Sequence, residues 1–288
     1  MSYHDITFLV CSCDKYEDAW HPFFELLHIY AGALPGCQFV LNTETKQYHS
    51  PHYDIRTVNT PGHTTWSQRM RHVMEQIDTE FVFLLLDDFF IKAPFDHQRF
   101  QKVLNYMRED PTVGIVNIAP RNIPEAEAEQ LDDPSGDISV HDDMEEQFFI
   151  RNQTRETIRI GFAPTIWRTS FLLSLIRDHE NIWLFEEYVG QRASQTPMKI
   201  VRYITHAPAV FDYDFYICRG MGITCGKWLP GNEPFFLSHG LHVDVQKLGV
   251  LQAFTRADVT RLTDTKRSIL SRIRNRIRLM LLRPRSLK

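Results

Sequence analysis

The stretch TWSQRMRHVMEQIDTEFVFLLLDDFF, residues 65–90, decides the fold of this 288-residue chain. Its first four residues fit a capping box, which predicts the start of a helix. Apolar residues then recur at the spacing of one helical face. The continuous apolar run Phe81–Leu86 follows, and such a run is typical of a central strand covered on both faces. We therefore expect a helix and then a buried strand that stops at Asp87 and Asp88.

Helices and strands alternate on both sides of this stretch. The first strand is expected at Ile6–Cys11, where β-branched and aromatic residues are bounded by a polar run. Further elements are expected at 18–30 (helix), 38–41 (strand), 96–108 (helix), 113–118 (strand), 170–176 (helix) and 185–193 (helix), with an apolar segment at 162–167. Alternation of this kind predicts an α/β fold with a mostly parallel sheet between two layers of helices.

The composition excludes several classes of protein. The chain is 43% hydrophobic and 24% charged, as expected of a folded globular protein. The longest apolar run is Phe81–Leu86, far short of the roughly 20 residues that a membrane-spanning helix needs. The first residues lack the features of a signal peptide, so a cytoplasmic location is expected. Five cysteines without a CxxC pair argue against a disulfide framework and a zinc ribbon.

Charge is unevenly distributed along the chain. Residues 125–146 contain ten Asp or Glu and no Lys or Arg, which predicts a mobile, solvated loop, with an ordered flap over a site as the alternative. Residues 266–288 contain nine Lys or Arg and no acidic residue, although the whole chain has a net charge of −4. An acidic body thus ends in a basic tail.

Asp87 and Asp88 are the sharpest candidates for a functional site. In open α/β sheets, ligands bind beyond the carboxyl ends of the strands, which is where this pair is expected. Two carboxylates beside an apolar strand need compensation. A divalent metal that carries a phosphorylated ligand would provide it. Alternatively, one Asp caps the following turn and the other meets an Arg.

The segment Trp183–Glu187 is the second candidate. Aromatic neighbours can desolvate a carboxylate and raise its pKa toward the range of a general base, so Glu186 could take a proton from an acceptor hydroxyl. The alternative is the start of an amphipathic helix, with Trp183 and Phe185 buried and both glutamates near the N-terminal dipole.

Several blocks together resemble a known family. These are ITFLVCSCDKYEDAW, TTWSQRMRHVMEQIDTEFVFLLLDDFF, APTIWRTSFL, IWLFEEYVGQRA and CGKW, in this order within residues 6–228. The set is similar to a bacterial family of GT-A glycosyltransferases from surface-polysaccharide pathways. The resemblance implies a GT-A-like mixed, mostly parallel sheet in a catalytic domain at 1–260, with a nucleotide-sugar half at 1–120 and an acceptor half at 150–260. It also implies transfer of a sugar from a nucleotide donor.

The resemblance also assigns roles to residues. Ser12, Cys13 and Asp14 would lie near the base or ribose of the nucleotide. Asp87 and Asp88 would take the place of the acidic motif that holds a metal, Mn²⁺ or Mg²⁺, and the donor diphosphate. Glu186 would be the catalytic base of an inverting enzyme. Arg69 would face the donor, or else be an ordinary surface arginine of its helix.

One departure from the family pattern leaves metal dependence open. The usual motif is Asp-any-Asp, whereas the sequence here is LDDF at 86–89. Either Asp88 binds a metal alone, with phosphate and water, or a cationic side chain such as Lys227 replaces the metal. A late histidine, His239 or His242, is a candidate for a further metal ligand.

The basic tail predicts contact with a membrane surface. A helix over 267–282 places Ile269, Ile273, Ile277 and other apolar residues on one arc, with arginines on both flanks. Such a helix suits the headgroup layer of an anionic membrane. Docking of the apolar stripe on the body or on another subunit is the alternative. Nucleic-acid binding is not expected of an acidic protein without a nucleic-acid motif.

The sequence therefore favours a glycosyltransferase with a nucleotide-sugar donor and a saccharide or lipid-linked acceptor. It would act at the inner face of the plasma membrane in the assembly of a bacterial surface glycan. Two other hypotheses stay open, namely a metal-dependent phosphohydrolase that uses Asp87 and Asp88, and a non-catalytic scaffold at the membrane.

Overall fold

The computed structural model describes residues 2–60, 65–118, 138–143, 146–150, 160, 164–205, 209–213, 222–224 and 226–251. The chain divides into two compact units, Met1–Tyr213 and Asp214–Lys288. The division of the catalytic domain into halves at 1–120 and 150–260 stays a prediction. The predicted tail helix lies outside the described residues.

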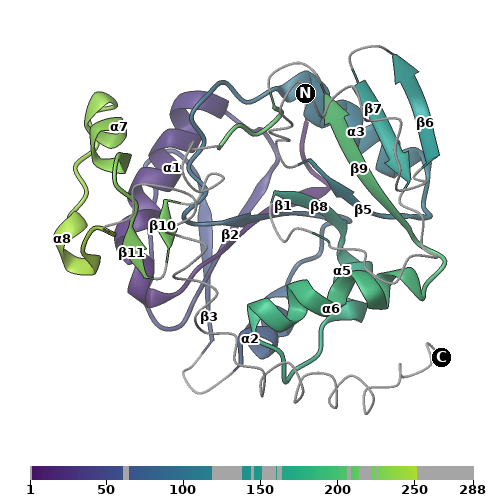
Figure 1. Ribbon diagram of the computed structural model, residues 1–288, viewed down its shortest axis with the longest axis horizontal. Coiled ribbons are helices and arrows are strands. Elements are labelled where there is room, and N and C mark those ends of the chain that lie inside the picture. The colour runs from purple at the N-terminus through teal and green to yellow at the C-terminus, as the bar shows by residue number, and fades with distance from the viewer. Residues whose placement is uncertain are drawn as a thin grey trace. The chain divides into compact units, whose positions relative to one another are not determined.

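The larger unit is built on a sheet that has nine strands in the described part of the chain, in the order β3-β2-β1-β4-β8-β5-β9-β7-β6 (Figure 1). Strands β8 and β7 run against their neighbours, and the remaining strands share one direction. The predicted mixed, mostly parallel sheet is therefore confirmed. The strands are β1 (Ile6–Cys11), β2 (Gln38–Thr43), β3 (Ile55–Asn59), β4 (Phe81–Leu86), β5 (Val113–Asn117), β6 (Ile138–Asp143), β7 (Glu146–Ile150), β8 (Thr165–Arg168) and β9 (Lys199–Thr205).

Helices cover both faces of this sheet. Figure 1 shows α2 (Trp66–Met74), α5 (Thr169–Leu175) and α6 (Ile182–Ser194) on one side, and α1 (Glu17–Ala31) and α3 (His97–Glu109) on the other. Side chains of β1 alternate between the two layers, because successive strand residues face opposite ways. The Phe8 ring lies 5.7 Å from that of Phe100 in α3. The Cys11 thiol, three residues on, lies 3.3 Å from the Met70 sulfur in α2.

The central elements match the sequence-based expectations closely. The strands expected at Ile6–Cys11 and Phe81–Leu86 are found with those bounds. Both are buried apart from Leu86, which is partly exposed. The predicted capping box is also present, since the Thr65 side chain accepts from the backbone of Gln68, whose side chain accepts in turn from the backbone of Thr65.

The prediction of a mobile, solvated loop at 125–146 needs correction in part. The prediction of a loop is wrong for Ile138–Asp143, which forms β6 and pairs antiparallel with β7. The sequence ISVHDD begins with alternating apolar and polar residues, and such alternation suits a strand that is half covered. The ten acidic residues of 125–146 favoured the prediction of a loop over this short pattern. Residues 119–137 lie outside the described part of the chain.

The smaller unit contains a hairpin and two short helices. They are β10 (Ile223–Thr224), β11 (Lys227–Trp228), α7 (Asn232–Ser238) and α8 (Val245–Leu248). The buried ring of Trp228 packs edge-on against Phe236 at 5.7 Å. The backbone of Trp228 bonds to Gly249 and Leu251, so the end of the described chain is fastened to the hairpin. Among the described residues, no helix has the length and apolar character that crossing a membrane requires.

Candidate active site

The direction in which successive strands are added to the sheet reverses between β1 and β4. From β1 it moves outward to β2 and β3, and it then returns to place β4 on the other side of β1. All four strands are parallel, so their carboxyl ends meet at one edge. Cys11 and Leu86 are opposite each other in the register, so Ser12 and Asp87 follow side by side. In open α/β sheets this switch point is where a ligand-binding crevice forms.

Asp87 and Asp88 lie at this point and are both buried. Their exposed fractions are 3% and 9%. The Ser12 hydroxyl donates to Asp87 Oδ2, and Trp20 Nε1 donates to Ser12 Oγ at 2.5 Å. Burial, and then the charge of Asp88, raise the pKa of Asp87 well above its usual range, although the bond from Ser12 opposes the shift. Both residues are thus buried at the end of β4, where negative charge is poorly solvated.

A divalent cation fits this carboxylate pair chemically. Carboxylate oxygens are preferred ligands of Mg²⁺, which commonly uses one or two of them together with phosphates and water. None of the ion pairs among the described residues includes Asp87. The described residues also contain no cluster of three or more potential metal ligands. Within the described part of the chain, phosphate and water would complete the coordination.

Asp14 fastens the start of the connection between β2 and β3. Its carboxylate accepts from the backbone amides of Glu44, Thr45 and Lys46 at 3.0–3.2 Å, and from the Thr45 hydroxyl at 2.5 Å. Partial burial raises the pKa of Asp14, but these bonds outweigh it and lower the pKa to about 2. Both oxygens of Asp14 are therefore engaged with the protein. Its contact with a nucleotide stays a prediction that this geometry does not favour.

Arg69 lies at the same edge of the sheet. Its guanidinium pairs with Glu44, which follows β2, and its side chain is only 14% exposed. The alternative of an ordinary surface arginine is therefore wrong. Arg69 Nε is buried with no hydrogen-bond partner in the structure.

Cys13 lies near the same charges. Burial, followed by the negative charges of Asp87 and Glu44, raises the pKa of its thiol to about 11. The thiol is therefore protonated at neutral pH. A protonated thiol offers a weak donor and a small apolar contact.

Glu186 and the aromatic residues beside it belong to the first half of α6. Phe185 is fully buried, Glu186 is partly exposed and Trp183 is 69% exposed. The alternative that buried both Trp183 and Phe185 is wrong for Trp183. The two residues are about 200° apart around a helix, so only one of them can face the core.

Contacts that were not predicted from the sequence hold α6 against α2. The Glu180 carboxylate, 1% exposed, accepts two bonds from the Arg192 guanidinium at 2.6 and 2.8 Å. The Glu180 carbonyl accepts from the backbone amide of Ser67 in α2 at 3.2 Å. Arg71 of α2 also binds Asp178 at 2.7 Å. The helix of Glu186 is thus fixed to the helix of Arg69.

The remaining predicted residues belong to the smaller unit. Lys227 is exposed on β11. His239 ends α7, where its Nδ1 lies 2.8 Å from the Phe235 carbonyl and 3.1 Å from the Ser238 hydroxyl. His242 lines a pocket of about 350 Å³ together with Glu233, Phe236, Leu237, Leu241, Val243 and Asp244. The roles of Lys227 and His239 at the carboxylate pair stay predictions.

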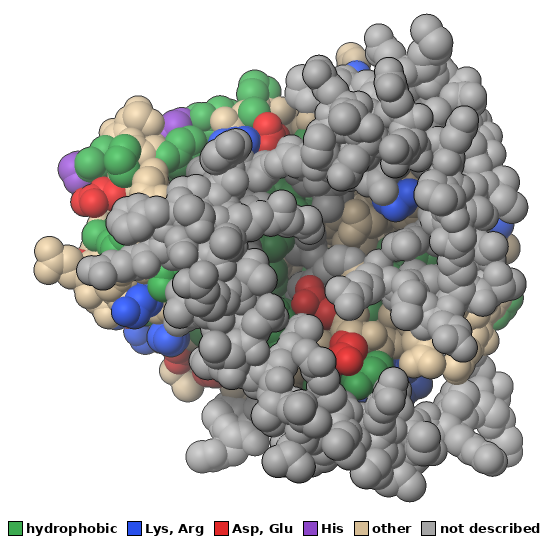
Figure 2. Space-filling model, in the orientation of Figure 1, with side chains coloured by type: hydrophobic (Ala, Val, Ile, Leu, Met, Phe, Trp, Pro, Cys, Tyr) green, Lys and Arg blue, Asp and Glu red, His purple; other side chains and the backbone are tan. Residues whose placement is uncertain are grey.

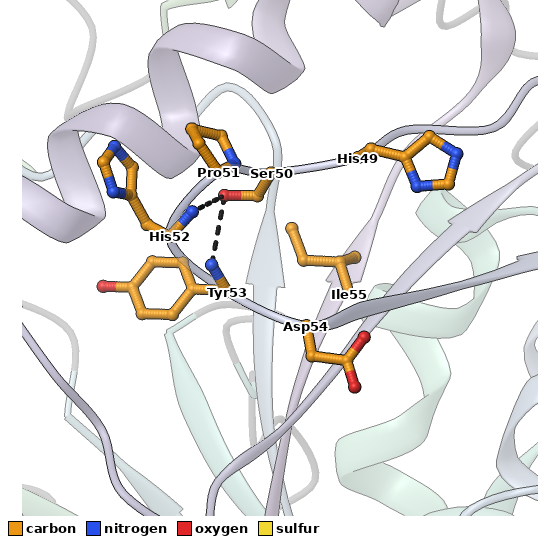
Figure 3. Close-up of a pocket in the computed structure, with 7 residues that line it drawn as sticks. All are labelled: His49, Ser50, Pro51, His52, Tyr53, Asp54 and Ile55. Atoms are coloured by element: carbon orange, nitrogen blue, oxygen red, sulfur yellow. Dashed lines mark hydrogen bonds between the residues drawn. The ribbon is translucent and has the colours of Figure 1, made fainter.

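A second pocket lies on the connection between β2 and β3. Its volume is about 340 Å³, and it is lined by His49, Ser50, Pro51, His52, Tyr53, Asp54 and Ile55 (Figure 3). The Ser50 hydroxyl accepts from the backbone amides of His52 and Tyr53 and shapes this turn. None of the sequence-predicted site residues lines it.

In the space-filling view, acidic side chains are visible near the middle of the face shown (Figure 2).

Comparisons with known proteins give no family. No family model matches the sequence, and no curated protein matches it. Among solved structures, the crystal structure of S. aureus TarS 1-349 is similar with a TM-score of 0.46 and 10% identity, covering 73% of this chain and 59% of that one. The same protein in complex with UDP gives a TM-score of 0.42 and 11% identity, again over 73% and 59%.

A third similar structure is CMP:2-keto-3-deoxy-manno-octonic acid synthetase complexed with CTP. Its TM-score is 0.37 with 16% identity, over 68% of this chain and 88% of that one. The chain thus spans less than two thirds of the TarS chains that it matches. At TM-scores below 0.5 these similarities decide neither a family nor an activity.

Proposed function

We propose that this protein is a glycosyltransferase that moves a sugar from a nucleotide-sugar donor to a saccharide or lipid-linked acceptor. The observation that carries the proposal is the buried pair Asp87 and Asp88 at the switch point between β1 and β4. A crevice at the carboxyl ends of parallel strands suits a nucleotide. A buried carboxylate pair suits a cation that is shared with a diphosphate. Arg69, which keeps one donor unbound at this edge, suits the same anionic ligand.

The proposed reaction is a single displacement at the anomeric carbon. The acceptor hydroxyl oxygen forms a bond to that carbon, and the bond from carbon to the diphosphate oxygen breaks. The electron pair leaves with the nucleoside diphosphate, and the hydroxyl proton passes to Glu186 as general base. One displacement inverts the configuration. Mn²⁺ or Mg²⁺, held by Asp87 and Asp88, would supply charge neutralisation for the leaving diphosphate.

Turnover of a panel of UDP-, GDP-, dTDP- and CDP-sugars tests this proposal. We expect the wild-type protein to release the nucleotide from one class of donor, faster when a glycan acceptor is present. Glu186→Gln should lower kcat by about 100-fold or more, as expected when a general base is lost. Glu109→Gln is the matched control, because Glu109 is an exposed glutamate at the end of α3, on the other face of the sheet, and it should keep kcat. Equal rates for the two variants would remove Glu186 from the mechanism.

Donor binding in Asp88→Asn separates a transferase from a scaffold, and phosphate release separates a transferase from a phosphohydrolase. In a transferase Asp88→Asn should abolish donor binding, whereas Asp54→Asn, at an exposed carboxylate, should not. A phosphohydrolase would instead release phosphate from simple esters. A scaffold would bind no nucleotide in either form.

We also propose that residues 266–288 attach the protein to the inner face of the plasma membrane. Their nine basic residues would be attracted to anionic lipid by about 1 kcal/mol each near the surface. The full chain should therefore sediment with phosphatidylglycerol vesicles, less so at high salt, and a chain ending at residue 265 should stay in the supernatant. Equal sedimentation of both would contradict membrane binding through the tail.

A further inference from the structure

Trp183 is an exposed aromatic residue on an otherwise well-packed helix. It lies in the first turn of α6 and is 69% exposed, the highest fraction among the large hydrophobic residues that the structure describes. Phe185, two positions later, is fully buried and packs 5.2 Å from Trp66 of α2. The indole of Trp183 therefore points away from the core because of the helical register and does not pack into the fold.

Two carboxylates share the helical face of this indole. Residues three and four positions apart are neighbours on a helix surface, which places Glu186 and Glu187 beside Trp183 one turn further along. An aromatic ring offers a flat apolar surface to the C–H groups of a sugar ring. Carboxylates accept hydrogen bonds from its hydroxyl groups. The ring and the carboxylates together complement a saccharide, which presents both C–H groups and hydroxyl groups.

The residues around Trp183 argue against a membrane or a protein partner as its ligand. An anionic membrane attracts basic residues, whereas the residues beside this ring are acidic. Stable protein interfaces bury about 800 Å² on each partner around apolar centres. The residues on either side of Trp183, Ile182 and Leu184, are only partly exposed, so the ring is not the centre of a broad apolar patch.

The helical turn that carries Trp183 is fixed by contacts at its cap and on its buried side. Asn181 caps α6 by accepting from the Leu184 amide at 2.9 Å. The neighbouring Glu180 carboxylate is bound twice by Arg192, whose guanidinium lies 5.6 Å from the Phe185 ring centre. The first turn of the helix is therefore fixed at both its cap and its buried side. Because the backbone of this turn is already fixed, only the side-chain rotation of Trp183 has to be ordered when a ligand stacks on its ring.

We infer that Trp183 is the stacking platform for the acceptor saccharide, placed so that a hydroxyl of the stacked unit reaches Glu186. This inference rests on the proposed function for the role of Glu186. It adds the residue that binds the acceptor and the chemical class of the ligand, a neutral or weakly charged sugar ring.

The first test is binding of the full chain to an array of bacterial surface oligosaccharides. Trp183→Ala should weaken binding to the bound glycans by about 10-fold or more, equivalent to about 1.4 kcal/mol. Trp183→Phe should keep most of the affinity, since it preserves an aromatic face. Ile29→Ala is the control, because Ile29 is another exposed apolar residue of the larger unit, at 49%, and it should bind as the wild type does. Unchanged binding by Trp183→Ala, or no glycan bound by the wild type, would overturn the inference.

The second test uses the glycan that binds best as acceptor in the turnover assay. Trp183→Ala should raise the acceptor KM about 10-fold and leave kcat near its original value, whereas Glu186→Gln should lower kcat. A lower affinity of Trp183→Ala for phosphatidylglycerol vesicles, with glycan binding intact, would overturn the inference in favour of a membrane contact. Glycan binding through Trp183 without nucleotide release would refute the transferase and leave the saccharide site standing.

Discussion

Replacing Arg192 by Met should destabilise the protein more than most single substitutions. The change removes the partner of the Glu180 carboxylate, which is 1% exposed and accepts bonds of 2.6 and 2.8 Å from the guanidinium. Breaking a buried ion pair from one side costs about 3–5 kcal/mol, because an uncompensated charge remains. For a unit of this size, each kcal/mol lowers Tm by about 2–4 °C, so a fall of about 6–20 °C is expected.

A double-mutant cycle measures the same effect directly. Glu180→Met together with Arg192→Met removes both charges, and an apolar replacement of a whole buried pair is often neutral or stabilising. The double variant should therefore recover most of the stability that Arg192→Met loses in urea and thermal unfolding. A cost below about 1 kcal/mol for Arg192→Met, or a double variant as unstable as the single one, would contradict a stabilising role of this ion pair.

Three further outcomes follow from the packing and the pKa values. Gly114→Ala would place a Cβ 2.4 Å from the Phe171 ring, so it should cost about 1–3 kcal/mol by overpacking, and Gly114→Ala with Phe171→Leu should be less destabilised in urea unfolding. Leu84→Ala, at a fully buried position of β4, should cost about 2–5 kcal/mol in the same assay. Asp14→Ala should lower Tm at neutral pH. Because the pKa of Asp14 is lowered from 3.8 to about 2 in the folded state, its stabilisation is present above pH 3.8 and is lost as the pH falls toward 2. The gap in Tm between this variant and the wild type should therefore shrink over that range, and a constant gap would contradict the assignment.

The sequence predicted the elements whose signals are local. Strand β4 is a continuous apolar run, and α2 carries its own capping box, so neither depends on distant partners for recognition. Strand β3 was missed because only Val58 in it is buried. An edge strand of this kind shows no apolar alternation to read. Strand β6 was missed because its acidic neighbours obscured a short alternating pattern.

The candidate site was predictable where a charge follows a buried strand. That rule placed Asp87 and Asp88 at the sheet edge correctly, because the end of an apolar run is visible in the sequence. The partners of these residues were not predictable. Ser12 meets Asp87 across 75 positions of the chain, and Asp14 binds Thr45 across 31. The ion pair between Glu180 and Arg192 depends on how the connection before α6 folds back along that helix, which periodicity alone does not report.

The proposed function requires Asp87 and Asp88 to hold a nucleoside diphosphate through a divalent cation. Its most direct test is the thermal stability of the full chain with UDP, GDP, dTDP and CDP, each with and without Mn²⁺. A ligand that binds only the folded state raises Tm. We expect a selective rise in Tm with one nucleotide, larger with Mn²⁺ and absent in Asp88→Asn. No rise with any nucleotide, in protein shown to be folded, or an equal rise in Asp88→Asn, would contradict it.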